Sequence, residues 1–213
     1  MGSFEYAWLR ENALSARVVL PGGELVEVAG EEVRSFVGAG GKGIVVGAKL
    51  RTRRADADVP FGAAFESAGE LACAVVGVVE AGLPLWHLAF LDPGMARARN
   101  LEESFMLFGA YPADRGESIE QGLGGVLASC RGRALSAAEA YRAWGERFFP
   151  VTPSNPPAPF SGLSRELISL AELPEKLSGS EARPTPPAVQ GTVARSREVL
   201  LLTLDAREQE WAR

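Results

Sequence analysis

A glycine-rich stretch between an acidic and a basic segment constrains the fold of this chain more than any other feature. It reads "FVGAGGKGIVVGAKLRTR", Phe36–Arg53, and holds five glycines in its first twelve residues. β-Branched residues follow from Ile44, which predicts a turn that leads into a strand. Walker-type phosphate loops and dinucleotide-binding fingerprints instead run from a strand into a helix. Because Lys42 is also followed by Gly43 and not by serine or threonine, neither kind of loop is expected.

The residues before this stretch predict a β-hairpin and a short helical segment. Within "ALSARVVLPGGELVEVAG", residues 13–30, a valine-rich run and an alternating run flank the sequence Pro-Gly-Gly. Proline fixes φ and glycine supplies a positive φ, so this tripeptide is suited to a turn between two strands. Residues 31–37 then place apolar side chains at helical spacing over one or two turns.

The pattern changes after Arg54, and the next elements predict an α+β sandwich. Strands are expected near residues 59–66, 84–92 and 103–112, and helices at 67–83 and 118–130, in the order strand–helix–strand–strand–helix. Ser67 and Glu70 form the expected start of the first helix, and Gly77 inside it suggests close packing on a sheet. This order is that of a split βαβ, or ferredoxin-like, arrangement.

The remainder of the chain predicts further elements of the same α+β kind. Residues 135–149 predict an amphipathic helix, with Leu135, Ala138, Tyr141, Ala143 and Trp144 on one face. The proline-rich residues 150–162 predict a linker or a long surface loop. A strand and a short helix are expected over 165–179, and a hairpin over 189–205 whose apolar closing strand lies centrally in a sheet.

Composition excludes several classes of function. The net charge of −5 opposes non-specific binding to nucleic acid, and no run approaches the roughly 20 apolar residues of a membrane span. The single histidine, His87, has no cluster of other ligands, so no metal site is expected, and a structural or surface role is expected for its ring. Cys73 and Cys130 are expected to be buried, unpaired thiols, and the location cytoplasmic.

The first part of the chain resembles a known family. The ordered series "YAWLRENALSARVVLPGGELVEV" and "FVGAGGKGIVVGAKLRTR" is similar to the second half of the FAD-binding domain of FAD-linked oxidases of the vanillyl-alcohol-oxidase and p-cresol-methylhydroxylase type, which include glycolate oxidase. The resemblance implies an α+β fold: a partial, β-rich FAD-binding domain over residues 1–54, followed by a ferredoxin-like cap domain over 55–213. The first half of the FAD-binding domain, with its pyrophosphate-gripping loop, is not represented.

The resemblance implies FAD as the cofactor and names the residues that would approach it. Gly41, Gly43 and Ile44 are the backbone positions carried over, and Tyr6 and Arg10 would lie nearby. The alternative is that the glycines only form a tight turn. Tight binding of FAD by this chain alone is not expected, because most contacts to the dinucleotide would have to come from the missing half. The catalytic residues and the metal chemistry of hydroxy-acid oxidases are not carried over.

Two functions are compatible with these features. One is a subunit or truncated relative of an FAD-dependent oxidoreductase that oxidises a small hydroxy acid or alcohol, with another chain supplying the first half of the FAD site. The other is a non-catalytic structural or assembly subunit that has lost FAD binding. Both predict an exposed apolar surface where the other half would dock. Phe4, Tyr6, Trp8 and Leu9 are the candidates for it, with simple core packing as the alternative.

Overall fold

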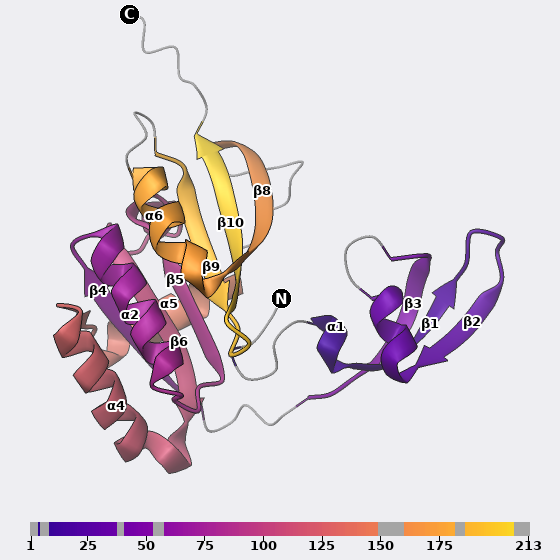
Figure 1. Ribbon diagram of the computed structural model, residues 1–213, viewed down its shortest axis with the longest axis horizontal. Helices are drawn as coiled ribbons and strands as arrows, with labels where there is room; N and C mark the ends of the chain where they lie inside the picture. Colours follow the sequence, from indigo (N-terminus) through magenta and orange to yellow (C-terminus); the bar gives the residue numbers. More distant parts are fainter. Residues whose placement is uncertain are drawn as a thin grey trace, which may run out of the picture.

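The chain contains two β-sheets, as a computed structural model that describes residues 4, 9–37, 41–52, 58–148, 160–181 and 186–206 shows (Figure 1). One sheet has three strands and the other has seven. The three-stranded sheet stands apart from the seven-stranded one in Figure 1. Helices and strands occur together in the seven-stranded part, so the predicted α+β class is confirmed. Arg54, where the division into two domains was predicted, lies outside the described residues, and that boundary stays a prediction.

The three-stranded unit follows the predicted hairpin closely. Its elements in chain order are α1 (Leu9–Asn12), β1 (Ala13–Val19), β2 (Leu25–Ala29), the 3-10 helix η1 (Gly30–Ser35) and β3 (Ile44–Leu50). β1 lies in the middle and pairs antiparallel with both neighbours. A small core of alanine and valine side chains lies between this sheet and η1, and it consists of Ala16, Val18, Val28, Val33 and Val37.

The first half of the larger unit has the ferredoxin-like topology that the sequence predicted. Its elements are β4 (Asp58–Phe65), α2 (Ala68–Glu80), β5 (His87–Leu91), α3 (Pro93–Ala98), β6 (Phe105–Pro112), η2 (Ala113–Arg115), α4 (Gly116–Ser129) and β7 (Arg133–Ala134). The strand order β7-β4-β6-β5 is the 4-1-3-2 order of a split βαβ arrangement. The Ser67 hydroxyl accepts a hydrogen bond from the Glu70 amide, so the predicted cap of α2 is confirmed.

The rest of the chain extends the same sheet. It contributes α5 (Ala137–Gly145), η3 (Glu146–Phe148), β8 (Phe160–Ser169), η4 (Leu170–Glu172), α6 (Leu173–Glu181), β9 (Ala188–Val193) and β10 (Glu198–Ala206). β9 pairs with β5, and β10 lies between β9 and β8, so the apolar closing strand is an interior strand as expected. Every strand pair in the seven-stranded sheet is antiparallel.

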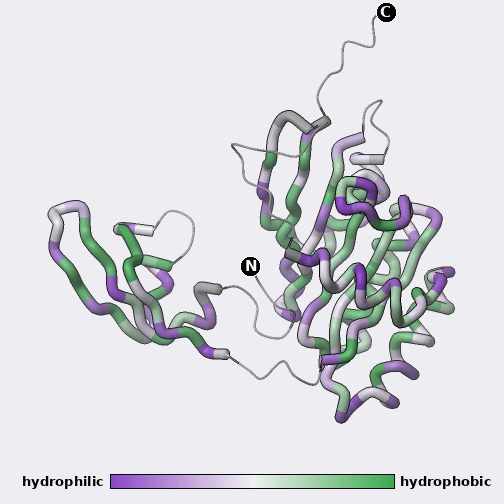
Figure 2. The backbone as a smooth tube through the Cα atoms, turned by 180° about the vertical axis from the view of Figure 1, so that it is seen from behind, coloured by the Kyte–Doolittle hydropathy of each residue, from purple (hydrophilic) through white to green (hydrophobic). Residues whose placement is uncertain are grey.

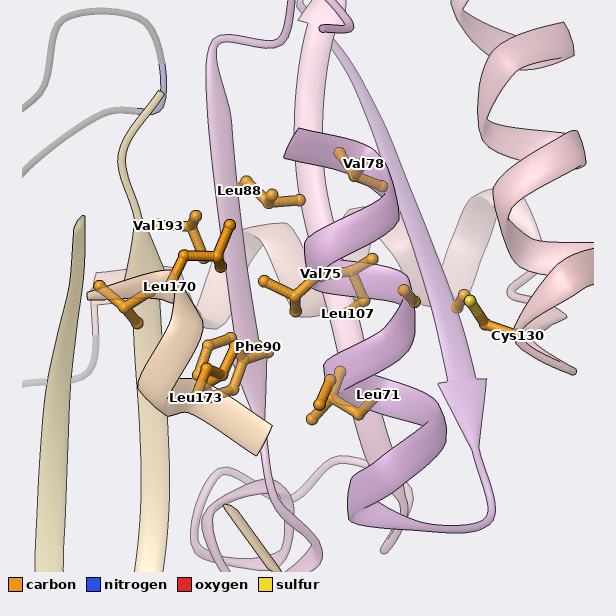
Figure 3. Close-up of a cluster of buried hydrophobic side chains, with 14 of the residues drawn as sticks. Leu71, Val75, Val78, Leu88, Phe90, Leu107, Cys130, Leu170, Leu173 and Val193 are labelled. Atoms are coloured by element: carbon orange, nitrogen blue, oxygen red, sulfur yellow. The ribbon is translucent and has the colours of Figure 1, made fainter. Parts of the chain in front are cut away.

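Helices cover both faces of the seven-stranded sheet. On one face, Leu71, Val75 and Val78 of α2 pack on Leu88 and other residues of the sheet in the largest core cluster (Figure 3). Side chains of α4 and α6 belong to the same cluster. On the opposite face, α3 and α5 close a second core with the alternate residues of β5 and β6. All five residues of β5 are buried as a result, because helices cover the strand on both faces.

The pairing of β5 with β9 joins the ferredoxin-like half of the sheet to the β9–β10–β8 half. We call this pairing the β5–β9 seam; it contains three residue pairs, with Phe90 opposite Gly191. Phe4 continues the seam beyond the strand ends. Its N–H donates to the Trp86 carbonyl over 3.0 Å, and its carbonyl accepts from the Arg195 amide over 2.8 Å. With a side chain that is 1% exposed, Phe4 is a core residue and not a docking aromatic.

Two further expectations are corrected by the structure, and one helix was not predicted. Gly77 is close to helix α4 and not to a sheet, since a Cβ there would lie 2.9 Å from Val126 Cγ1. Tyr141 is 58% exposed, because the buried face of α5 is formed by Ala140 and Ala143. α3 was not predicted, although Asp92 caps it and Pro93 is its first residue.

The prediction of unpaired cysteines is also wrong. Cys73 and Cys130 are joined by a disulfide, with their Cα atoms 5.8 Å apart. Cys73 lies on α2, and Cys130 is the residue that ends α4. The two helices pack side by side on the same face of the sheet, which brings together cysteines 57 positions apart in the sequence.

We predict that Phe4→Ala destabilises the seven-stranded unit by about 3–5 kcal/mol, the typical loss for a deleted buried phenylalanine ring. Hydrogen exchange of the β5 and β9 amides measures the change in opening free energy. Leu25→Ala is the matched control, because Leu25 is 58% exposed on the other sheet. Equal protection of the seam in the Phe4→Ala and Leu25→Ala variants would contradict a stabilising role for Phe4.

Candidate functional site

The glycine-rich turn leads directly into strand β3, as predicted. Gly41 to Gly43 precede Ile44, the first residue of β3, and no helix begins at Lys42. The start of the turn, residues 38–40, lies outside the described residues. β3 is an edge strand of its sheet, because the order is β2-β1-β3. The phosphate-loop interpretation therefore stays excluded by the order of elements.

Gly43 is close to the neighbouring strand β1. A Cβ atom at this position would lie 2.6 Å from Val18 Cγ1 and 2.6 Å from the Val19 carbonyl oxygen. This approach alone requires a glycine, since real Cβ atoms do not come so near to a backbone oxygen. The contact favours the alternative in which the glycine shapes a tight turn, and it leaves the approach of a cofactor to Gly41 and Ile44 untested.

Strand β3 exposes four large apolar side chains. Ile44 is 70% exposed, Val46 50%, Leu50 41% and Val45 40%. The apolar residues run along the strands of this unit in Figure 2. Single exposed apolar residues are ordinary, whereas an exposed, apolar edge strand can pair with or be covered by another polypeptide. Of the candidates named for the apolar docking surface, Phe4 is buried, Tyr6 and Trp8 lie outside the described residues, and of Leu9 only the backbone is described, so that surface stays a prediction.

A buried polar cluster lies on the α5 face of the seven-stranded sheet. The His87 ring, at the start of β5, meets the Trp144 ring edge-on with centroids 5.4 Å apart. The Arg147 guanidinium lies 3.8 Å over the same Trp144 ring. Burial, and then the positive charge of Arg147, lower the pKa of His87 to about 4. The imidazole is therefore neutral at physiological pH, and its Nε2 has no hydrogen-bond partner among the described residues.

Arg99 holds the other end of this cluster together. It follows α3, is 3% exposed, and donates to the Gln190 side-chain oxygen on β9 and to the Glu146 carbonyl of η3. Burial lowers the pKa of Arg99 to about 10, so the guanidinium remains charged at neutral pH. The contacts link α3, η3 and β9 on one face of the sheet. Because His87, Arg99 and Gln190 are all nearly inaccessible, the cluster fixes the α5–η3 cover in this form and offers no open cavity to a ligand.

A second buried charge site lies where β5 ends. Asp92 Oδ1 accepts from the Met95 amide over 2.7 Å and caps α3. Burial raises the pKa of Asp92 to about 7, despite the hydrogen bonds and the nearby Arg97 that favour the charged form. Asp92 also lines a cavity of about 270 Å³ between α3 and the residues that precede β9.

The structure places only part of the predicted cofactor residues. Gly41, Gly43 and Ile44 lie together at the entry of β3. Tyr6 lies outside the described residues, and of Arg10 only the backbone, in α1, is described. The buried polar cluster was missed, although a glutamine within the otherwise small and apolar strand "AVQGTV" was a usable signal. No group of histidine, cysteine and acidic side chains in the described ranges could hold a metal ion.

Comparisons by sequence identify no relative of this chain. No family model matches it, and no curated protein matches it. Among the described residues, no helix is long and apolar enough to cross a membrane.

Although no relative is found by sequence, several solved structures share the fold of this chain. p-Cresol methylhydroxylase with substrate bound is 13% identical, with a TM-score of 0.59 over 96% of this chain and 53% of its own. Alkyldihydroxyacetonephosphate synthase is 12% identical, with a TM-score of 0.57 over 94% of this chain and 47% of its own. The wild-type BBE-like 1 of Physcomitrella patens is 15% identical, with a TM-score of 0.57 over 94% and 51%. The chain thus spans about half the length of the structures that it matches.

We predict that His87 makes folding less favourable in acid. A pKa that falls from 6.5 to about 4 means that the unfolded chain binds a proton more readily. Relative to strongly acidic solution, the neutral imidazole adds about 3 kcal/mol to the free energy of unfolding above pH 6.5, and this contribution is lost as the pH falls to 4. His87→Phe should remove it, as urea unfolding at several pH values would measure. An NMR titration of the single histidine near pH 6.5 would contradict the prediction.

Asp92 should have the opposite effect in nearly the same pH range. Its pKa rises from 3.8 to about 7 on folding, so its favourable contribution, about 4 kcal/mol, is present below pH 3.8 and lost as the pH rises to 7. Asp92→Asn retains a side-chain oxygen that can cap α3 but cannot ionise. The variant should match the wild type in stability at pH 3.5 and exceed it at pH 8. Equal stability at pH 8 would show that the carboxylate is not disfavoured by burial.

Proposed function

Since this chain has the fold of the FAD-linked oxidases of the vanillyl-alcohol-oxidase and p-cresol-methylhydroxylase type, we propose that it forms part of an FAD-dependent oxidoreductase. It contributes the Gly41–Ile44 edge of the FAD site and the cap domain. A half-domain outside this sequence, on another chain, contributes the rest of the site. The substrate that we propose is a small hydroxy acid or alcohol, as in a glycolate-oxidase-like enzyme. FAD would supply the redox chemistry, and this chain would position it.

The observation that carries this proposal is the exposed apolar edge strand beside the glycine-rich turn. Ile44 is both a residue of the predicted cofactor edge and the most exposed large apolar side chain of β3. A docked half-domain would cover Ile44, Val45 and Val46 and would bring its own part of the FAD site next to Gly41. This chain matches only about half of each solved structure. A partner could supply the part that corresponds to the other half, which supports the same arrangement.

A second candidate is a structural or assembly subunit without FAD. The close approach of Gly43 to Val18 and Val19 favours it, because this contact requires the glycine without any cofactor. Both candidates place a partner on β3, and they differ in whether flavin is bound in the resulting complex.

We predict that the isolated chain binds no FAD tightly and that the complex does. An incomplete site loses most of the contacts that offset the loss of freedom of the bound dinucleotide. The absorption spectrum between 350 and 500 nm would be recorded for the chain alone and for the chain produced together with the products of adjacent genes. Tight FAD binding by the chain alone would refute the half-site. A colourless complex that contains a partner would support the structural subunit.

The variant for this test must disturb the docking surface and leave the fold intact. Gly43→Val would block the backbone's approach to FAD, but its side chain would also collide with β1. If this variant bound no flavin, the result would not show whether the cofactor contact or the fold had been lost. Ile44→Lys changes a side chain that is 70% exposed, and Leu167→Lys, on β8 of the other sheet, is the matched control at 49% exposure. We expect Ile44→Lys to lose the partner and the flavin spectrum, and Leu167→Lys to retain both.

A further inference from the structure

The two cysteines of the disulfide differ in exposure to solvent. Cys73 is in the middle of α2 with an exposed side chain, whereas Cys130 is 5% exposed at the end of α4. An open groove of about 620 Å³ runs beside the bond between the two helices, lined mostly by small and apolar residues such as Ala72, Val76 and Val126. A small thiol can therefore reach Cys73 from solvent.

Helix α4 is weakly specified by its own sequence. It contains Gly116, Gly122, Gly124 and Gly125 among 14 residues, and its N-terminal cap makes no side-chain hydrogen bond. A glycine inside a helix lowers its stability by about 1 kcal/mol relative to alanine. Packing does not require the last two glycines, since a Cβ at Gly124 or Gly125 would meet no atom within 4 Å. Alanine would fit at both positions, so the glycines lower the helix stability of this end of α4 without serving its packing.

Fewer buried side chains anchor the second half of α4 than the first half. Its fully buried side chains, Ile119 and Leu123, belong to the first two thirds of the helix. The Tyr111 hydroxyl bonds to Glu120 over 2.6 Å, also in the first half. After Leu123, Val126 and Leu127 are only partly buried against the core. The bond from Cys130 to Cys73 is the covalent contact of this end with α2, beside the packing of Val126 on Gly77 and the ion pair of Arg131 with Glu70 over 3.9 Å.

We propose that Cys73 is a site of thiol–disulfide exchange and that opening of this disulfide releases the C-terminal part of α4. The thiolate of a small thiol, such as glutathione, attacks Cys73 Sγ. A mixed disulfide forms there, the Cys73–Cys130 bond breaks, and Cys130 leaves as a thiolate that takes a proton from water. A second thiolate then attacks the mixed disulfide, which frees the Cys73 thiol and yields one molecule of glutathione disulfide. The protein gains two electrons and two protons, and two thiols are oxidised.

The order of attack is testable at the level of peptides. The complete chain would be exposed briefly to reduced glutathione, quenched in acid and alkylated with iodoacetamide. Trypsin separates the two cysteines, because Arg97, Arg115 and Arg131 lie between or after them. We expect glutathione on the Cys73 peptide and the alkyl group on the Cys130 peptide. Glutathione found first on Cys130, or free thiols in the protein before any reductant is added, would overturn the assignment.

The release of α4 is tested by hydrogen exchange of the oxidised and the reduced chain. We expect the amides of residues 124–129 to exchange on the order of tenfold faster after reduction, with those of α5 unchanged. α5 is the internal control, because it has a capping box and no cysteine. Equal acceleration throughout the seven-stranded unit would show that the disulfide stabilises the whole unit and does not hold α4 alone, which would refute the proposal. The absence of any acceleration at α4 would refute it too.

The two glycines provide the matched variant. Gly124→Ala and Gly125→Ala fill open space, and each should slow opening of the reduced helix by about fivefold. The double variant should therefore bring the exchange of reduced α4 back towards that of the oxidised wild type. Unaltered exchange in the reduced double variant would mean that helix propensity does not limit the stability of this segment, and the proposed release would be wrong.

Discussion

The β5–β9 seam is the interaction on which the larger unit depends. Without it, the ferredoxin-like strands and the β9–β10–β8 strands would be two separate sheets, each with an open edge. The pairing is short, and two further contacts strengthen it. The Phe90 ring covers Gly191 across the seam, and Phe4 bridges Trp86 and Arg195 where the strands have ended. A residue near the start of the chain thereby completes a sheet whose strands lie more than 50 residues further on.

The local elements could be predicted because they carry local signals. The Pro-Gly-Gly turn, the Ser67 cap and the apolar runs of β4 and β10 each depend on residues within a few positions of one another. The ferredoxin-like order followed from these elements, since the sequence of helices and strands restricts the possible topologies. The missed helix α3 had a local signal too, because aspartate followed by proline is a usual helix start.

The features that could not be predicted depend on contacts between distant residues. No period or spacing indicates that Cys73 would meet Cys130, that Arg99 would meet Gln190, or that Phe4 would enter the core. With the disulfide in place, buried free thiols no longer support the expected cytoplasmic location, which stays a prediction. The glycine-rich segment was predicted correctly as a turn that enters a strand, whereas its role as a cofactor edge stays a prediction. The reason for Gly43 includes a neighbour, Val18, that becomes visible only when β1 and β3 are paired.

Because Phe4 is anchored in the seven-stranded unit, the three-stranded unit is attached to it at both of its ends. The chain leaves the seven-stranded unit at Phe4, forms the small sheet, and returns to begin β4. The small unit is therefore an insertion with two attachment points and not an appendage on a single link. Two attachments restrict rotation more than one, so the exposed face of β3 is presented over a narrower range of orientations. A partner that docks there loses less orientational entropy on binding, and one broken peptide bond in either connection would leave the unit attached.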